Sequence, residues 1–146
     1  MSVASIAAPT APAEFRWPIR VYYEDTDAGG IVYYANYLKF FERCRTEWLR
    51  ALGVDQIALA RDHGLQFVVT SLGCDYRLPA RLDDALTVCA ALERAGRASL
   101  VFVQRILRGE ELLASGRVKV ACVDTRRLAP AAMPDTLLAA LRQGPR

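Results

Sequence analysis

Histidine is nearly absent from this chain of 146 residues, which contains only one, His63. A cysteine–histidine catalytic pair would have to use it, but the surrounding "ARDHGL" predicts a surface position at the end of a short helix. The strained GxSxG turn of serine hydrolases is missing, as are the phosphate-binding patterns GxxxxGK[ST] and GxGxxG. The sequence therefore gives little support to a serine or cysteine nucleophile, or to a nucleotide held by a glycine-rich loop.

Close pairs of metal ligands are missing too. The four cysteines are far apart in the sequence, form no CxxC pair and have no neighbouring histidine, whereas zinc sites usually take ligands from such pairs. Scattered cysteines in apolar segments are typical of reduced core residues, which predicts a reducing, cytoplasmic compartment. We therefore expect neither a metal site nor a cofactor. The cysteines are Cys44, Cys74, Cys89 and Cys122.

No apolar run approaches the ~20 residues of a membrane span, so none is expected. Residues 1–14 lack the basic start and unbroken apolar run of a signal peptide and are predicted to form a disordered tail. Residues 15–146, with a chain hydrophobic content of 53%, are expected to form a single domain. The net charge of +3 falls short of the dense basic face that non-specific nucleic-acid binding needs, so no nucleic-acid partner is expected.

The order of predicted elements indicates an α+β fold. One long amphipathic helix is followed by strands at hairpin spacing, which predicts an antiparallel sheet with the helix covering one face. The absence of βαβ alternation excludes a doubly wound nucleotide-binding fold. The predicted strands cover residues 15–24, 65–78, 86–94, 98–108 and 112–123, and the predicted helices cover residues 35–52, 55–63 and 134–143.

The stretch "EDTDAGGIVYYANY", residues 24–37, gathers three carboxylates, two glycines and three tyrosines between the first strand and the long helix. It does not match a calcium loop of the EF-hand type, because Gly29 falls where an oxygen ligand is needed and Asn36 falls where a bidentate glutamate is needed. Asp and Gly are also ordinary turn residues, so a solvated acidic turn is an alternative. A third explanation is a catalytic site.

The catalytic explanation follows from the residue types. Gly29 and Gly30 permit close approach of a ligand to the backbone. The amides of residues 32–35 are predicted to be unpaired donors at a helix start, which favour a developing oxyanion. An upstream carboxylate could attack a carbonyl held there, or activate water against it. This chemistry is acyl transfer without serine, cysteine or metal. Asp25 is expected to brace the turn, and Glu24 is expected to be a solvated charge.

The sequence also carries a resemblance to a known family. The stretch "YYEDTDAGGIVYYANYLKFFERCRTEWLRALG" resembles the 4-hydroxybenzoyl-CoA thioesterase family of hotdog-fold enzymes, whose pattern is D-x-D-x-x-G-x-V-x-Y/H-x-x-Y before a long helix. Within the family, the chain is most similar to the acyl-CoA thioesterases associated with the bacterial Tol–Pal system. The segments "GRASLVFVQRI" and "VKVACVDTRRLAPAAMP" also resemble that branch. The resemblance covers roughly residues 17–135 and implies a hotdog fold, an antiparallel β-sheet wrapped around one long central helix.

The resemblance also implies roles for particular residues. In such enzymes the second aspartate of the D-x-D pair is the catalytic carboxylate, which is Asp27 here. The oxyanion donor is a backbone amide at the start of the central helix, which falls at Tyr34, where many Tol–Pal-associated members have histidine. Gly30 matches the glycine that lets the thioester approach. Glu42 falls where members with aromatic substrates place a polar group of the acyl pocket.

Further implications concern partners. Hotdog enzymes are dimers, commonly dimers of dimers, with active sites at the subunit interface and coenzyme A along the surface between subunits. The resemblance therefore implies a homodimer or homotetramer with acyl-CoA as substrate. It also implies that Arg94 and Arg97 contact the nucleotide phosphates, with Arg77 and Arg81 as alternatives.

Three functional hypotheses follow from the sequence. The leading one is a cytoplasmic acyl-CoA thioesterase, with Asp27 as a nucleophile or as a general base towards water. The second is a thioesterase for acyl groups on acyl carrier protein, since Arg43, Arg45 and Arg50 could form a surface for an acidic partner. The third is a non-catalytic acyl-CoA binding or scaffold protein of the cell-envelope Tol–Pal system. A carboxylate beside the thioester argues against the third.

Overall fold

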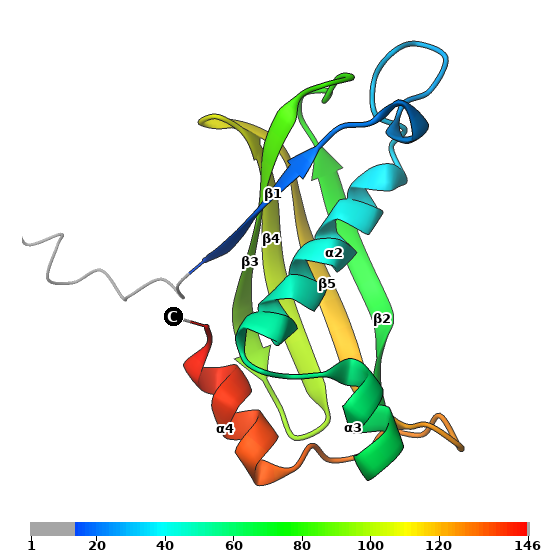
Figure 1. Cartoon of the computed structure of the whole chain (residues 1–146), viewed down its shortest axis with the longest axis vertical. Helices are drawn as coiled ribbons and strands as arrows, with labels where there is room; N and C mark the ends of the chain where they lie inside the picture. The colour runs from blue at the N-terminus through cyan, green and yellow to red at the C-terminus, as the bar shows by residue number, and fades with distance from the viewer. Residues whose placement is uncertain (1–13, 146) are drawn as a thin grey trace, which may run out of the picture.

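The computed structural model describes residues 14–145. The predicted tail therefore lies outside the described residues except for Glu14, whose carboxylate pairs with Arg105. The elements, in chain order (Figure 1), are β1 (Phe15–Arg20), the 3-10 helix η1 (Tyr23–Asp25), α2 (Asn36–Ala51), α3 (Gln56–His63), β2 (Leu65–Tyr76), β3 (Ala85–Ala95), β4 (Ser99–Arg108), β5 (Glu111–Asp124) and α4 (Asp135–Gln143).

The strands form one antiparallel sheet in the order β1-β3-β4-β5-β2. Figure 1 shows α2 lying obliquely across one face of this sheet, with α3 and α4 at the end of the molecule where α2 finishes. The predicted α+β class and the antiparallel sheet around a long helix are confirmed. Among residues 14–145, no helix is both long and apolar enough to cross a membrane.

The core lies between α2 and the sheet. The helix buries a stripe with the predicted spacing of three and four residues, and these side chains pack on the inward face of the central strands. Trp48 meets Phe102 of β4 edge to face, with ring centroids 5.1 Å apart. The buried residues of α2 are Asn36, Tyr37, Phe40, Phe41, Cys44, Trp48 and Leu49.

The first strand was expected to reach residue 24 but ends at Arg20, because the Asp25 carboxylate accepts the Tyr22 N–H and turns the chain into η1.

All four cysteines are free thiols, as expected. Three are buried and Cys74 is half-buried. Burial raises the pKa of the Cys44 thiol to about 12, so this thiol is protonated at neutral pH.

Gly116 of β5 makes room for the central helix. A Cβ at this position would lie 2.8 Å from Cε2 of Phe41, well inside an ordinary carbon–carbon contact. We expect Gly116→Ala to lower the free energy of unfolding by about 1–2 kcal/mol, because the Phe41 ring must shift. Urea unfolding followed by tryptophan fluorescence measures the change. Gly73→Ala is the matched control, since a Cβ at Gly73 meets nothing within 4 Å; equal stability losses in the two variants would contradict this explanation.

The two edge strands differ in length and exposure. β1 has 6 residues and contains Pro18, whereas β2 has 12 residues. Strand β2 also exposes apolar side chains, including 45% of Val69 and 44% of Leu72. A long apolar edge with free backbone groups is a template for pairing with another chain. Within the described chain, β2 is the edge best suited to such pairing.

Candidate active site

The acidic loop, residues 25–33, is closed on itself by backbone hydrogen bonds. The Asp27 N–H donates to the Ile31 carbonyl at 2.9 Å, and the Tyr33 N–H donates to the Asp25 carbonyl at 2.9 Å. Thr26 and Val32 form an antiparallel bridge between these two bonds. The chain therefore doubles back so that residues 25–27 lie beside residues 31–33, directly before the start of α2.

Asp25 ties this loop to the helix. Its side chain is buried, with 4% exposure, and accepts hydrogen bonds from the Tyr22 N–H at 2.8 Å and from Asn36 Nδ2 at 2.7 Å. Asn36 is the first residue of α2. Both carboxylate oxygens are thus used in holding the turn against the helix start, which is the bracing role expected for Asp25.

Asp27 differs from Asp25 in exposure and in its partners. It is exposed, and its Oδ1 accepts the Gly29 N–H at 2.8 Å. A Cβ at Gly29 would lie 3.2 Å from that oxygen, so a larger residue would press on the carboxylate. Gly30 has a φ of 80°, a left-handed conformation that favours glycine. Among residues 14–145, Oδ2 of Asp27 accepts no hydrogen bond, which leaves one carboxylate oxygen available for chemistry.

The amides at the helix start divide into two groups. The Val32 N–H donates to the Ala80 carbonyl at 2.9 Å, and the Tyr33 N–H is used within the acidic loop. By contrast, the backbone N–H groups of Tyr34 and Ala35 donate to no acceptor within residues 14–145. The expectation of free donors over residues 32–35 was therefore too broad. Of these four amides, those of Tyr34 and Ala35 are the two that are free to donate to a bound group.

Tyr34 has an exposed side chain and a backbone carbonyl that is bonded from the sheet. The side chain is 63% exposed, and its ring lies against that of Tyr33 with centroids 4.9 Å apart. Its carbonyl accepts a hydrogen bond of 2.8 Å from the hydroxyl of Tyr76, the last residue of β2. Sequence reasoning missed Tyr76, because no local motif links the end of β2 to a peptide 42 residues earlier.

Glu42 lies beside a small cavity between α2 and the sheet. The cavity has a volume of about 120 Å³, with polar groups from α2 and α3 and an apolar floor from the sheet. The Glu42 carboxylate itself is exposed and accepts the Thr46 hydroxyl at 2.5 Å. The lining residues are Glu42, Arg45, Thr46, Leu49, Gln56, Phe67, Val69, Leu100, Phe102 and Val120.

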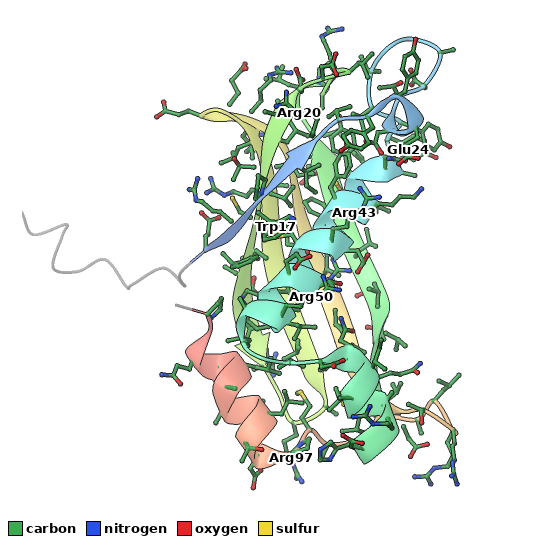
Figure 2. All side chains as sticks on the ribbon, viewed as in Figure 1. Trp17, Arg20, Glu24, Arg43, Arg50 and Arg97 are labelled. Atoms are coloured by element: carbon green, nitrogen blue, oxygen red, sulfur yellow. The ribbon has the colours of Figure 1, made fainter. Side chains whose placement is uncertain are left out.

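Arg94 and Arg97 lie far from the acidic loop of the same chain. Arg94 is close to the end of β3, and Arg97 lies in the turn that follows. Figure 2 shows Arg97 and Glu24 at opposite ends of the molecule. The structure therefore does not bring these two arginines to Asp27 within one subunit. Arg77 and Arg81 follow β2, at the end of the molecule that carries the loop, and Ile31 forms a bridge with Arg81.

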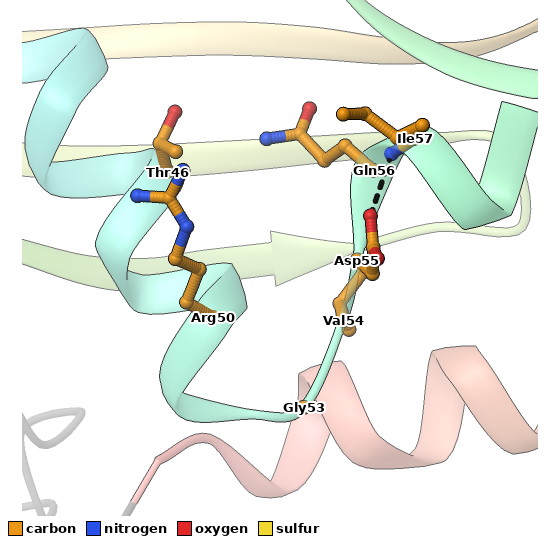
Figure 3. Close-up of a pocket in the computed structure, with 7 residues that line it drawn as sticks. All are labelled: Thr46, Arg50, Gly53, Val54, Asp55, Gln56 and Ile57. Atoms are coloured by element: carbon orange, nitrogen blue, oxygen red, sulfur yellow. Dashed lines mark hydrogen bonds between the residues drawn. The ribbon is translucent and has the colours of Figure 1, made fainter.

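A larger hollow lies at the other end of α2 and contains none of the predicted site residues. It has a volume of about 500 Å³, and Figure 3 shows that Arg50, Asp55 and Gln56 are among the residues around it. Asp55 is occupied as the N-cap of α3, where its Oδ1 accepts the Ile57 N–H at 2.9 Å. This hollow lies between α2 and α3, and its two charged residues already have partners, because Arg50 pairs with Glu47 and Asp55 caps α3.

An antiparallel sheet around a central helix, with a carboxylate loop leading into the helix start, defines a hotdog-fold thioesterase. A sequence model of the thioesterase-like superfamily matches residues 21–141, and the chain belongs to that family. The predicted family resemblance is confirmed.

Individual relatives agree with this assignment. The chain is 48% identical to "Acyl-CoA thioesterase YbgC" of Haemophilus influenzae over 126 residues, which cover 86% of this chain and 93% of the relative. It is 47% identical to "Acyl-CoA thioester hydrolase YbgC" of Escherichia coli O157:H7, over 88% of this chain and 96% of the relative.

Solved structures give the same fold. A probable thioesterase from Bartonella henselae superposes with a TM-score of 0.79 at 36% identity, covering 84% of this chain and all of that one. The 1,4-dihydroxy-2-naphthoyl-CoA thioesterase of Synechocystis has a TM-score of 0.82 at 21% identity, covering 89% of this chain and 96% of that one. At that identity the second likeness supports the fold alone.

Proposed function

We propose that this protein hydrolyses acyl-CoA thioesters to the free acid and coenzyme A, with Asp27 as the catalytic carboxylate and the helix-start amides as the oxyanion hole. One observation carries the proposal. Within residues 14–145, the acidic loop provides a carboxylate oxygen without a partner, on Asp27, and the two residues that follow the loop, Tyr34 and Ala35, provide amides without an acceptor. The names of the YbgC relatives support the thioester of an acyl-CoA as the substrate.

The chemistry can follow two routes from this arrangement. As a nucleophile, the free oxygen of Asp27 attacks the thioester carbon, the coenzyme A thiolate leaves and takes up a proton, and water then cleaves the mixed anhydride. As a general base, Asp27 takes a proton from a water molecule that attacks the carbonyl; the tetrahedral intermediate then collapses, the carbon–sulfur bond breaks and the coenzyme A thiolate takes up the proton. In both routes the carbonyl oxygen becomes negative opposite the free amides. Each such donor stabilises the transition state by on the order of 3 kcal/mol.

The cavity beside Glu42 supports the assignment of this residue to an acyl pocket. Its floor is apolar, as an acyl chain requires, and polar side chains, including Glu42 and Thr46, lie along α2. Glu42 is eight residues after Tyr34, a rise of about 12 Å along a helix. An acyl group whose carbonyl lies at the helix start could extend along α2 towards this cavity.

A second copy of the chain would complete the site. Asp27, Gly30 and Tyr34 are exposed in one chain, whereas a thioesterase site needs walls that bind the acyl group and exclude water. Antiparallel pairing of β2 with its counterpart would turn the end that carries Arg94 and Arg97 towards the partner's acidic loop. These arginines would then be candidates for phosphate contacts made across the interface. Size-exclusion chromatography with light scattering tests the dimer, and a monomer mass would contradict it.

The acyl carrier protein alternative receives less support. Arg43 and Arg50 lie along α2 in Figure 2, but Arg50 pairs with Glu47 at 2.7 Å. Arg45 is half-buried and donates to Gln104 Oε1 at 2.9 Å. The three arginines therefore do not form one free cationic surface. Tol–Pal association stays a prediction from the resemblance, and a cytoplasmic location stays a prediction from the scattered cysteines.

A panel of thioesters tests the proposal. We expect purified protein to release free thiol from one or more acyl-CoAs in a series of increasing chain length that includes benzoyl- and hydroxybenzoyl-CoA. The matched acyl carrier protein thioesters form the second arm of the panel. Turnover of the carrier-protein thioesters alone would favour the second hypothesis. Tight binding of acyl-CoA with no turnover of any thioester would favour a binding protein.

A further inference from the structure

Tyr76 makes a contact that the proposed chemistry does not yet use. Its hydroxyl donates to the Tyr34 carbonyl at 2.8 Å, and this carbonyl belongs to the same peptide group as the Ala35 N–H. Tyr34 lies before Ala35, the N-cap of α2, so its carbonyl precedes the regular hydrogen bonds of the helix. The hydrogen bond therefore comes from the sheet, and it reaches the residue that carries the other free amide.

Aromatic contacts hold the Tyr76 ring in place. Its centroid lies 5.2 Å from that of Tyr37 at an interplanar angle of 72°, and 6.3 Å from that of Tyr34 at 86°. Both are edge-to-face arrangements, which are favourable for aromatic pairs. The packing of these rings therefore directs the Tyr76 hydroxyl towards the Tyr34 carbonyl.

The hydroxyl also keeps its proton. Burial, with further contributions from Cys74, raises the pKa of Tyr76 to about 12. The phenol is therefore neutral and able to donate a hydrogen bond at neutral pH. A donor at a peptide carbonyl polarises that peptide and makes its N–H a stronger donor. The same bond restricts rotation about the Tyr34 Cα, between the two free amides.

We propose that Tyr76 is a positioning residue for the oxyanion hole, holding the Tyr34–Ala35 peptide so that the free N–H groups point at the developing charge. This inference rests on the proposed function of those amides. In neither catalytic route does Tyr76 touch a reacting atom. It acts through the Tyr34–Ala35 peptide, so a residue at the end of β2 affects the rate of the chemical step.

The test is Tyr76→Phe, which removes the hydroxyl and keeps the ring. With the acyl-CoA that the wild type turns over most efficiently, we expect kcat to fall about ten-fold and KM to change less than two-fold. The fall is smaller than the 10²–10³-fold loss of a whole oxyanion donor, because the amides remain present but less well aligned. Amide hydrogen exchange at Asn36 and Leu38, which close the first turn onto Tyr33 and Ala35, should become several-fold faster.

Tyr37→Phe is the matched control. It deletes a neighbouring hydroxyl that accepts the Ala80 N–H but does not reach Tyr34. We expect a lower melting temperature with kcat within two-fold of the wild type. A kcat for Tyr76→Phe that is unchanged, or that falls no more than in Tyr37→Phe, would overturn the inference, whatever the exchange rates.

Failure of the proposed function has a different signature. It would appear as an absence of turnover in the wild type, or as full activity after loss of the Asp27 carboxylate. In that case, unchanged exchange at Asn36 and Leu38 in Tyr76→Phe would separately overturn the positioning role. Faster exchange would support the structural half of the inference.

Discussion

Replacing Asp27 by asparagine is expected to lower kcat by about 10³-fold while leaving the fold intact. The size of the loss follows from the chemistry, since a positioned general base or nucleophile contributes about 10²–10⁴-fold. Asparagine keeps an oxygen that can accept the Gly29 N–H, so the local turn should survive. The second oxygen, which lacks a partner within residues 14–145, is replaced by an NH₂ group that can neither attack a thioester nor take a proton from water.

The appropriate control is Glu24→Gln, which removes the charge of an exposed carboxylate three residues earlier in the chain. Glu24 makes no ion pair with another residue of the described chain, and we assign it no role in the reaction. Its variant should keep kcat within two-fold of the wild type. Free thiol release from the best acyl-CoA, compared at equal protein and with matched circular dichroism spectra, measures both variants. Asp27→Asn with more than a tenth of wild-type kcat would remove Asp27 from its assigned role.

Most of the fold could be predicted from hydrophobic periodicity. The long helix was placed within one residue of its ends, because its buried stripe repeats every three or four residues and Gly53 follows it. The four later strands were also found, since they are strand-like runs separated by the turn segments "PARLDD", "RAGR" and "GEE". The first strand was overextended past Arg20. The alternation continues there, but the Asp25 side chain competes for the backbone, and periodicity does not register that interaction.

The candidate site was predictable only as far as it is local in sequence. Asp25, Asp27 and Tyr34 lie within one continuous motif, so residue types and the family resemblance could single them out. Tyr76 could not be found this way, because its contact with Tyr34 depends on the register of β2 and on the direction of α2 across the sheet. Arg94 and Arg97 present the opposite problem. A one-dimensional resemblance assigns them to a site that, within one subunit, lies at the other end of the molecule.

The separation of roles between the two aspartates leads to the second large effect. We expect Asp25→Ala to lower the free energy of unfolding by about 3 kcal/mol. The substitution leaves two donors without their acceptor, the Tyr22 N–H and Asn36 Nδ2, and each unsatisfied buried group costs about 1–3 kcal/mol. Asn36 itself is buried, so water replaces the lost partner poorly at that end. Urea unfolding measures the change. The dependence of the unfolding free energy on urea concentration should be the same in the variant and the wild type, because the substitution is expected to change stability alone.

A double-mutant cycle with Asn36→Ala isolates the bond between the two side chains. If Asp25 and Asn36 stabilise the loop together, the double variant should be more stable than the sum of the two single losses predicts, by about 1–2 kcal/mol. Glu24→Ala, at the exposed position beside Asp25, should change stability by less than about 0.5 kcal/mol. An Asp25→Ala protein that unfolds at the wild-type midpoint would show that the loop is held elsewhere. The expected contrast is a stable but inactive Asp27→Asn and an unstable Asp25→Ala, because one carboxylate is proposed to act on the substrate while the other holds the loop against the helix.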